Sequence, residues 1–400
     1  MSENSDFSRS TSHLSPTADL EAQSAPISIS EPSGVPTASA SQARQRSTAP
    51  TASASQARQR STAPTGSTLQ VRRAPAVGHF LRRYAIFLVL AVLVIFFQSR
   101  EPAFLRITNL FSVLQSVAVV ALLGIGVTVT LAVDGFDLSV GSVAAFTLML
   151  TSYAMVVLQF NAAQTVSLAL FTGAMIGLVN GFLIVWLRIP DLLATLGMMF
   201  LLAGLQLIPS AGRSITVGLN LPDGSVASGS FDPTFLAIGR YKLWGYVPLP
   251  VVIVALLAVL FWFLMERTRW GRVFYAVGGN ETAAYLAGAP VKRYRVLAYV
   301  ISAMLAALGG IFVAARVGRG DVFAGSSLLL DSVAAALIGF AVLNQRRANV
   351  VGTAVGAVFV GIVLNGLTML NVPYYTQDFV KGLVLVGALA LTFGIGRGRR

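Results

Sequence analysis

The chain has 400 residues, of which 55% are hydrophobic and 11% are charged, and its formal net charge is +13. This composition is typical of an integral membrane protein. The sequence has no cysteine, which excludes disulfides, thiolate metal sites and cysteine nucleophiles. Its two histidines, His13 and His79, precede the first hydrophobic span, so no histidine-based catalytic or metal site is expected in the hydrophobic part. We attribute the positive charge to cytoplasmic loops and a basic tail, and not to nucleic-acid binding.

Residues 1–78 are rich in Ser, Ala, Thr, Pro and Gln and contain almost no aromatic residue. Such a segment cannot bury enough apolar surface to offset the entropy lost on ordering. The sequence TASASQARQRSTAP occurs at 37–50 and again at 51–64, which indicates a tandem duplication and not a solenoid. We therefore expect a disordered cytoplasmic arm over 1–78 and a transmembrane domain over 79–400.

Ten hydrophobic stretches follow, each long enough or nearly long enough to cross a bilayer as a helix. They cover about 80–98, 110–132, 139–158, 163–187, 191–209, 247–265, 295–316, 328–343, 349–371 and 378–396. We predict an all-α membrane protein of about ten transmembrane helices. Lys and Arg collect on the cytoplasmic side of such spans, which places both termini and the polar loop 266–294 in the cytoplasm. The largest outer segment, 210–246, is expected to be an exposed loop.

The hydrophobic part contains two pairs of similar segments. GLVNGFLIVWLRIP at 177–190 resembles GIVLNGLTMLNVP at 361–373, and DLSVGSVAAF at 137–146 resembles LDSVAAALIGF at 330–340. This spacing assigns five spans to each half, and an odd number of spans inverts one half relative to the other. The sequence thus indicates two inverted five-helix repeats, with chance similarity between short apolar strings as the alternative.

The segment VDGFDLSVGS at 133–142 joins the second and third predicted spans. It contains two acids, Asp134 and Asp137, together with Ser139 and Gly141. Charged groups between apolar runs are costly unless they face water or polar protein groups, so these residues are candidates for the translocation pathway. The alternative is a plain turn in which Asp137 or Ser139 caps the following helix.

Two spans have glycines spaced by four residues: Gly173, Gly177 and Gly181 in the fourth span, and Gly352 and Gly356 in the ninth. This spacing lets helix backbones approach closely, and we expect it to serve packing. Asn180 and Asn365 lie on the same two spans. Each is a candidate for a hydrogen bond to a neighbouring helix or to a hydroxylated substrate in the pathway.

The loop 266–294 contains the sequence of a short helix. Asn280 is suited to an N-cap, Glu281 lies where the helix dipole favours an acid, and Gly288 is suited to ending the helix. We predict a two-turn helix over 281–287 that is presented to a cytoplasmic partner. The alternative is a surface turn that only supports the loop.

The sequence contains no G-x-x-x-x-G-K-[ST], G-x-S-x-G or H-E-x-x-H motif and no Rossmann glycine pattern. We therefore expect neither enzyme activity nor a cofactor in this chain. An ion-coupled secondary transporter of a small polar solute is the competing class. Such transporters usually have an acid or histidine well within a span, whereas the acids here lie at the ends of predicted spans.

Four segments, in order along the chain, carry a resemblance to a known family: GFDLSVGS (135–142), ATLGMMFLLAG (194–204), GGNETAAYLAGAPVKRYRVLAYVISAMLAALGGIFVAARVG (278–318) and VVGTAVGAVFVGIVLNGLTMLNVPYYTQDFVKGLVLV (350–386). Together they resemble the ribose-type permeases of bacterial ABC importers, over about residues 80–395. Two features depart from that family. GFAVLNQRRAN at 339–349 replaces a Gly-rich turn, and Tyr285 stands where a basic residue is frequent.

The resemblance implies an inner-membrane permease that works as a homodimer or heterodimer with a second permease copy. It implies that a periplasmic binding protein delivers a sugar or related polyol, and that a separate cytoplasmic ATPase binds ATP and Mg. It also implies that the short helix docks into the ATPase, with these residues at the contact: Gly279, Asn280, Glu281, Ala284, Tyr285, Gly288 and Pro290. The segment with Asp137, Ser139 and Gly141 is implied to lie near the translocation path.

Overall fold

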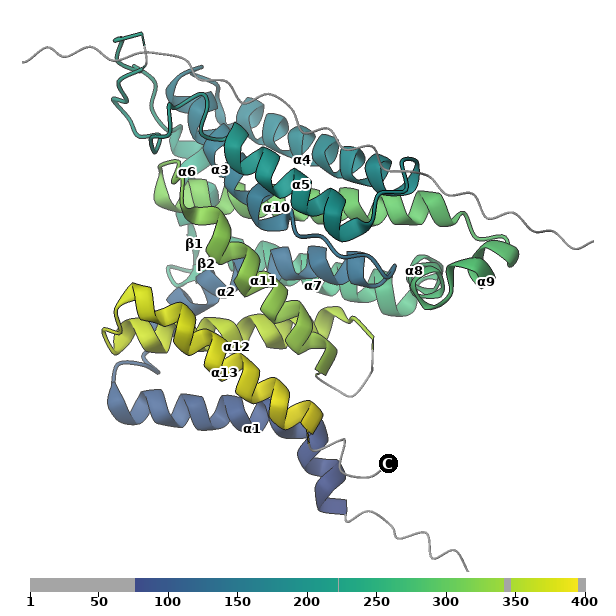
Figure 1. The fold of residues 1–400 in the computed structure, drawn as a ribbon. Coiled ribbons are helices and arrows are strands. Elements are labelled where there is room, and N and C mark those ends of the chain that lie inside the picture. Colours follow the sequence, from purple (N-terminus) through teal and green to yellow (C-terminus); the bar gives the residue numbers. More distant parts are fainter. Residues whose placement is uncertain (1–75, 222, 342–346, 395–400) are drawn as a thin grey trace, which may run out of the picture. The chain divides into compact units, whose positions relative to one another are not determined.

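The computed structural model describes residues 76–221, 223–341 and 347–394, all of which belong to the unit Val71–Arg400. Almost all of the arm expected over 1–78 therefore lies outside the described residues. The same holds for 342–346, within the segment that replaces the Gly-rich turn, and for the last residues of the tenth predicted span. The described part contains thirteen helices and two short strands (Figure 1).

Ten helices correspond in position to the ten predicted spans. They are α1 (Ala76–Arg100), α2 (Ile107–Leu131), α3 (Val140–Val156), α4 (Ala162–Val185), α5 (Asp191–Leu205), α7 (Leu249–Arg267), α10 (Val291–Val317), α11 (Ala324–Ala341), α12 (Val350–Met369) and α13 (Tyr374–Gly394). The connecting elements are α6 (Pro233–Arg240), β1 (Lys242–Leu243), β2 (Val247–Pro248), α8 (Arg269–Gly279) and α9 (Glu281–Leu286). In Figure 1, α6 and the two strands lie at one end of the long helices, and α8 and α9 lie at the other.

The segment 210–246, expected to be a loop, contains α6 and the strand β1. The helix forms because the side chain of Asp232 accepts a hydrogen bond of 2.8 Å from the backbone N–H of Thr234, and because Pro233 occupies the first turn. The strand β1 pairs with β2 in antiparallel register, with Lys242 opposite Pro248.

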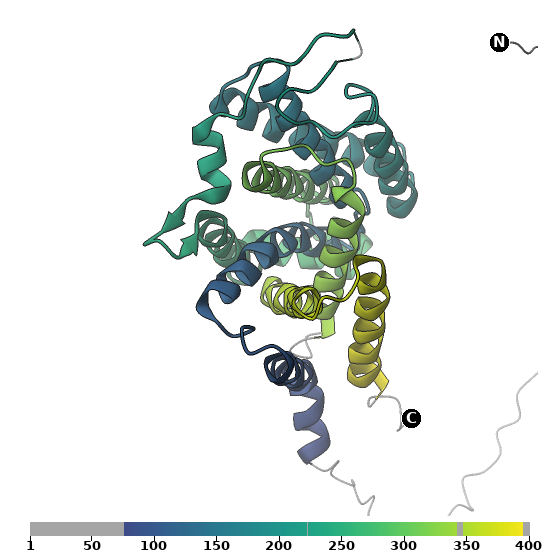
Figure 2. The ribbon, with the colours of Figure 1, turned by 90° about the vertical axis from the view of Figure 1, so that its left-hand side faces the viewer.

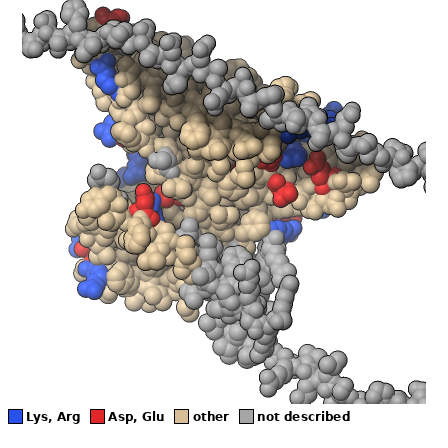
Figure 3. Space-filling view, viewed as in Figure 1, with Lys and Arg blue, Asp and Glu red and all other residues tan. Residues whose placement is uncertain are grey.

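Five helices, α2, α4, α7, α10 and α12, are long and apolar enough to cross a membrane. Shorter apolar stretches lie in α1, α3, α5 and α11. On the face shown in Figure 3, charged side chains gather mainly toward the ends of the helices and the surface between them is mostly uncharged. The chain is therefore a mostly helical protein with the surface of a multi-pass membrane protein.

The core is centred on α2 and α10, which pack against each other and against α3. Figure 2 views the same helices from one end. Leu122 and Ile125 of α2 and Ala303 and Ala306 of α10 are fully buried. The two helices come close because α2 has a glycine at the contact: a Cβ on Gly126 would lie 3.1 Å from the Cα of Ser302. These two helices therefore position the polar side chains that lie between them.

The glycines spaced by four residues lie at helix contacts, as predicted. A Cβ on Gly177 of α4 would lie 2.5 Å from the Cα of Val300 in α10. A Cβ on Gly352 or Gly356 of α12 would likewise meet the backbone of α11. The backbones approach too closely there for any larger side chain, which is how helices associate in membranes.

Candidate functional site

The short helix α9 lies between α8 and α10 at one end of the long helices (Figure 1). The side-chain oxygen of Asn280 accepts a hydrogen bond of 2.9 Å from the backbone N–H of Ala283 and so caps the helix. Glu281 occupies the first turn, where the helix dipole stabilises a negative charge. The helix ends before Gly288, whose φ of +85° favours glycine. The predicted short helix is therefore confirmed.

The side chains of α9 divide into one that is buried and several that are exposed. Ala284 packs into the rest of the chain and is only 6% exposed, whereas Tyr285 and Leu286 are 70% and 79% exposed. Ala284 therefore holds α9 against the protein, and the apolar surface that α9 presents outward comes from Tyr285 and Leu286. Leu286 was not among the contact residues that the family resemblance implied, and the sequence does not show which face of so short a helix is buried.

A second helix in the same loop, α8, was not predicted. Thr268 caps it, and Phe274 and Val277 form its buried face. Their spacing of three residues in an otherwise basic segment is the sequence signal that would have revealed an amphipathic helix. Its end lies against the connection between α2 and α3, where a Cβ on Gly278 would lie 2.8 Å from the backbone N of Asp134. Gly279, the last residue of α8, has open space where a Cβ would lie.

Polar contacts join α8 to the start of α12. The hydroxyl of Tyr275 donates a hydrogen bond of 2.9 Å to the carbonyl oxygen of Ala348. Arg347 forms an ion pair of 2.8 Å with Glu266 and lies 4.7 Å above the Tyr275 ring. Burial, together with the Glu266 carboxylate, raises the pKa of Tyr275 to about 12, so its hydroxyl keeps its proton and remains a donor. The loop 266–294 is therefore attached to the long helices at this second place.

The residues of the 133–142 segment contribute to a buried polar centre between α3, α4 and α10. One carboxylate oxygen of Asp137 accepts hydrogen bonds from the backbone N–H and the hydroxyl of Ser139, at 2.9 and 2.6 Å. Its other oxygen accepts a hydrogen bond of 2.7 Å from the hydroxyl of Ser302, and Asn180 donates one of 3.0 Å to Ser139. All four residues are fully buried. The structure thus brings three of the predicted pathway residues together and adds Ser302, which the sequence did not single out.

The other predicted pathway residues lie elsewhere. Asp134 is exposed, with a φ of +58°, in the connection that contacts α8. Gly141 lies where α3 meets α11, and a Cβ there would be 2.6 Å from the Cβ of Leu329. Asn365 of α12 and Asn109 of α2 exchange two hydrogen bonds, at 2.9 and 3.1 Å. The assignment of all these residues to a translocation pathway stays a prediction.

The chain resembles known transport proteins over most of its length. Residues 109–389 match the family described as branched-chain amino acid transport system / permease component. The chain belongs to this permease family. The ribose import permease protein of Escherichia coli K12 is 35% identical over 302 residues, which cover 76% of this chain and 91% of that protein.

Two further relatives agree with this family membership. The ribose import permease protein of Bacillus subtilis 168 is 34% identical over 311 residues, covering 78% of this permease and 92% of that protein. The galactose/methyl galactoside import permease protein of E. coli K12 is 30% identical over 326 residues, covering 78% of this permease and 94% of that protein. No solved structure matches the chain.

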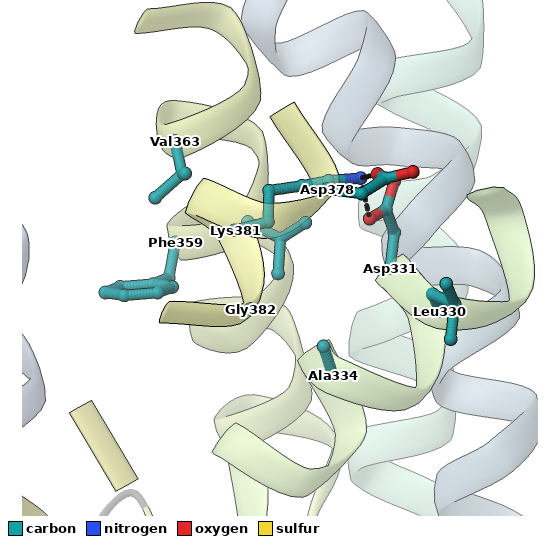
Figure 4. Close-up of a pocket in the computed structure, with 9 residues that line it drawn as sticks. Leu330, Asp331, Ala334, Phe359, Val363, Asp378, Lys381 and Gly382 are labelled. Carbon is teal, nitrogen blue, oxygen red and sulfur yellow. Dashed lines mark hydrogen bonds and ion pairs between the residues drawn. The ribbon is translucent and has the colours of Figure 1, made fainter. Parts of the chain in front are cut away.

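The permease also contains a charged cluster that the sequence did not reveal, because Asp331 was assigned to the eighth predicted span and Asp378 and Lys381 to the tenth. Lys381 of α13 contacts Asp331 of α11 at 3.1 Å and Asp378 at 2.6 Å. The side chains of Lys381 and Asp331 are 15% and 10% exposed. They lie at the edge of a mainly apolar cavity of about 170 Å³, with Phe359 and Val363 of α12 on another wall (Figure 4). In the described residues, no group of three His, Cys, Asp or Glu is placed to hold a metal ion.

Proposed function

We propose that this permease is the membrane subunit of an ATP-driven ABC importer that moves a sugar or a related polyol from periplasm to cytoplasm. Several relatives are named for the import or transport of ribose, galactose and D-allose. The observation that carries the proposal is α9, a capped helix with exposed Tyr285 and Leu286, in a chain whose sequence has no ATP-binding motif. A helix of this kind provides a surface on which a separate ATPase docks.

The proposal includes three partners: a cytoplasmic ATPase that binds ATP and Mg, a periplasmic binding protein, and a second permease copy, identical or homologous. We assign the contact with the ATPase to α9 and the residues around it, including Gly279, Gly288 and Pro290. The buried polar centre around Asp137 is proposed to lie beside the path of the substrate. This polar centre is closed to solvent in the structure, since Asp137, Ser139, Asn180 and Ser302 have no exposed surface.

We further propose that ten helices cross the inner membrane, with both termini in the cytoplasm. Support comes from the correspondence of ten helices with ten hydrophobic stretches. The basic residues of α8 and of the start of α10 lie at the same end as α9, which agrees with the excess of Lys and Arg on the cytoplasmic side. The opposite end, with α6 and the β1–β2 pair, is then the periplasmic side.

Helix pairing supports an inverted repeat that relates α2–α5 to α10–α13. In this repeat, α2, α3 and α4 correspond to α10, α11 and α12. Accordingly, α3 and α4 pack on α10, and α11 and α12 pack on α2. Similarly, α3 contacts α4 and α5 as α11 contacts α12 and α13. Such matched pairings follow when two halves share one fold and are joined about an approximate twofold axis. The axis would pass between α2 and α10.

An ion-coupled secondary transporter is the second candidate, and the buried acids Asp137 and Asp331 are the observations that favour it. Asp331 is, however, paired with Lys381, and Asp137 already accepts three hydrogen bonds from serines. Family membership also favours the importer.

The two candidates are distinguished by reconstitution. The full chain is purified with its ATPase, placed in liposomes, and assayed for uptake of labelled ribose, galactose and allose with the binding protein outside. We expect uptake to require ATP on the side of α9 and to be absent with a proton or sodium gradient alone. Uptake driven by an ion gradient without any ATPase would overturn the importer proposal.

A further inference from the structure

Arg295 of α10 joins three helices through one guanidinium group. Its Nη1 donates a hydrogen bond of 3.1 Å to the carboxylate of Glu281 in α9. Its Nη2 donates to both carboxylate oxygens of Asp191 at the start of α5, at 3.0 and 3.2 Å. Charge-assisted hydrogen bonds of this kind are the strong ones, and the rigid planar fork of arginine fixes the relative positions of its partners.

The contact with Glu281 is the only hydrogen bond between a side chain of α9 and another helix among the residues that the structure describes. Otherwise α9 is held by the buried methyl group of Ala284 and by its two short connections. A shift of α9 therefore acts directly on the guanidinium of Arg295.

From Asp191 the contacts continue into the buried polar centre. The hydroxyl of Tyr299, one turn after Arg295 on α10, donates a hydrogen bond of 2.7 Å to Asp191. Gly135 lies directly on this pair, since a Cβ there would be 2.5 Å from the Tyr299 hydroxyl and 2.9 Å from Asp191. Gly135 is two residues before Asp137, which contacts Ser302 on the next turn of α10. An unbroken series of contacts thus runs from α9 to Asp137.

The Nε atom of Arg295 is buried and has no hydrogen-bond partner within the described residues. An unpaired buried donor costs free energy. The arrangement around Arg295 is therefore not fully satisfied.

We propose that Arg295 is a positioning residue that transmits movements of α9 to the turn around Gly135 and hence to the polar centre at Asp137. This inference rests on the proposed function, in which an ATPase moves α9. In this mechanism, Arg295 does not bind the ATPase. It converts a displacement of Glu281 into a displacement of Asp191 and Tyr299, which hold the turn in place.

The test uses the full permease with its ATPase and binding protein. Glu281→Gln removes the charge opposite Arg295 and preserves the size of the side chain. Arg295→Lys keeps the positive charge but removes the rigid planar fork that fixes the relative positions of the two carboxylates. Glu281 is 57% exposed, so its replacement leaves the fold intact. Lys292→Gln is the matched control, because Lys292 is an exposed neighbour on α10 with no ion pair among the described residues.

We expect the ATPase to co-purify normally with Arg295→Lys, which lies outside the proposed docking surface, and the hydrolysis rate of that variant without binding protein to be unchanged. Stimulation of hydrolysis by the loaded binding protein should fall about tenfold, equal to about 1.4 kcal/mol of coupling. The double variant should be no worse than the worse single one, because both changes break the same contact. Lys292→Gln should behave as wild type.

Two results would overturn the inference. One is full stimulation in Glu281→Gln, which would show that the contact transmits nothing. The other is a loss of stimulation in Arg295→Lys that is matched by a loss of ATPase binding, which would make the contact part of the docking surface only. If instead the wild-type chain neither binds nor stimulates an ATPase, the proposed function itself is wrong. That result is distinguishable from the two above, which are seen only in the variants.

Discussion

Lys381 and Asp331, which are 50 residues apart in the sequence, form an ion pair of 3.1 Å between α13 and α11. Both side chains are largely buried, and each would be strongly unfavourable in an apolar environment without the other. The pair therefore makes the position of α13 depend on α11. Asp378 also contacts Lys381, but its side chain is 69% exposed, so water solvates its charge without help from Lys381.

The first prediction concerns this pair. Replacing Lys381 by Met leaves Asp331 buried without a partner, and we expect a loss of stability of about 3 kcal/mol. The double variant Lys381→Met with Asp331→Leu should recover much of that loss, because no buried charge remains. The measurement is thermal unfolding of the purified permease in one detergent. Asp378→Asn is the control and should have little effect. A single variant as stable as wild type would show that Asp331 reaches water without Lys381.

The second prediction concerns the exposed surface of α9. Leu286→Asp places a charge on the apolar surface proposed to meet the ATPase, and losing a central apolar contact there costs about 2 kcal/mol, or roughly thirtyfold in affinity. The amount of ATPase that co-purifies with the permease measures the effect. Val217→Asp, an exposed apolar residue in the segment at the opposite end, is the control. Retention of the ATPase by Leu286→Asp would place the docking surface elsewhere.

The third prediction concerns topology. The chain has no native cysteine, so single cysteines report their own position. Ser228→Cys and Thr282→Cys are both at exposed positions, and we expect a membrane-impermeant thiol reagent to label Ser228→Cys from the periplasm and Thr282→Cys from the cytoplasm. Thr282 is preferable to Ala284, which is buried. Labelling of both from one side would contradict the number of spans assigned between them.

The fourth prediction concerns the contact of α4 with α10. Gly177→Ala would place a methyl group 2.5 Å from the Cα of Val300, so the two helices must separate. We expect a loss of stability of about 1–3 kcal/mol, the usual cost of overpacking. Gly197→Ala in α5 is the matched control, because nothing lies within 4 Å of its added methyl group. Equal melting temperatures for the two variants would show that the α4–α10 contact yields easily.

The sequence alone was sufficient for features that depend on neighbouring residues. The apolar runs predicted the long helices, because an apolar helix of that length is stable only in a bilayer or a large core. The order Asn280, Glu281, Gly288 predicted α9, because capping, dipole and left-handed backbone signals act within one or two turns. The α8 helix had a comparable local signal in Thr268, Phe274 and Val277.

The tertiary structure decided which distant residues meet, and this could not be predicted from one sequence. Nothing near Asp137 in the sequence indicates Ser302, and nothing near Lys381 indicates Asp331, because each pair depends on how whole helices pack. The orientation of α9, with Ala284 buried and Leu286 exposed, likewise depends on the surface beneath it. Arg295 is the clearest case. By sequence it is a basic residue at the start of a predicted span, whereas in the structure it joins α9, α10 and α5 because the fold brings those helix ends together.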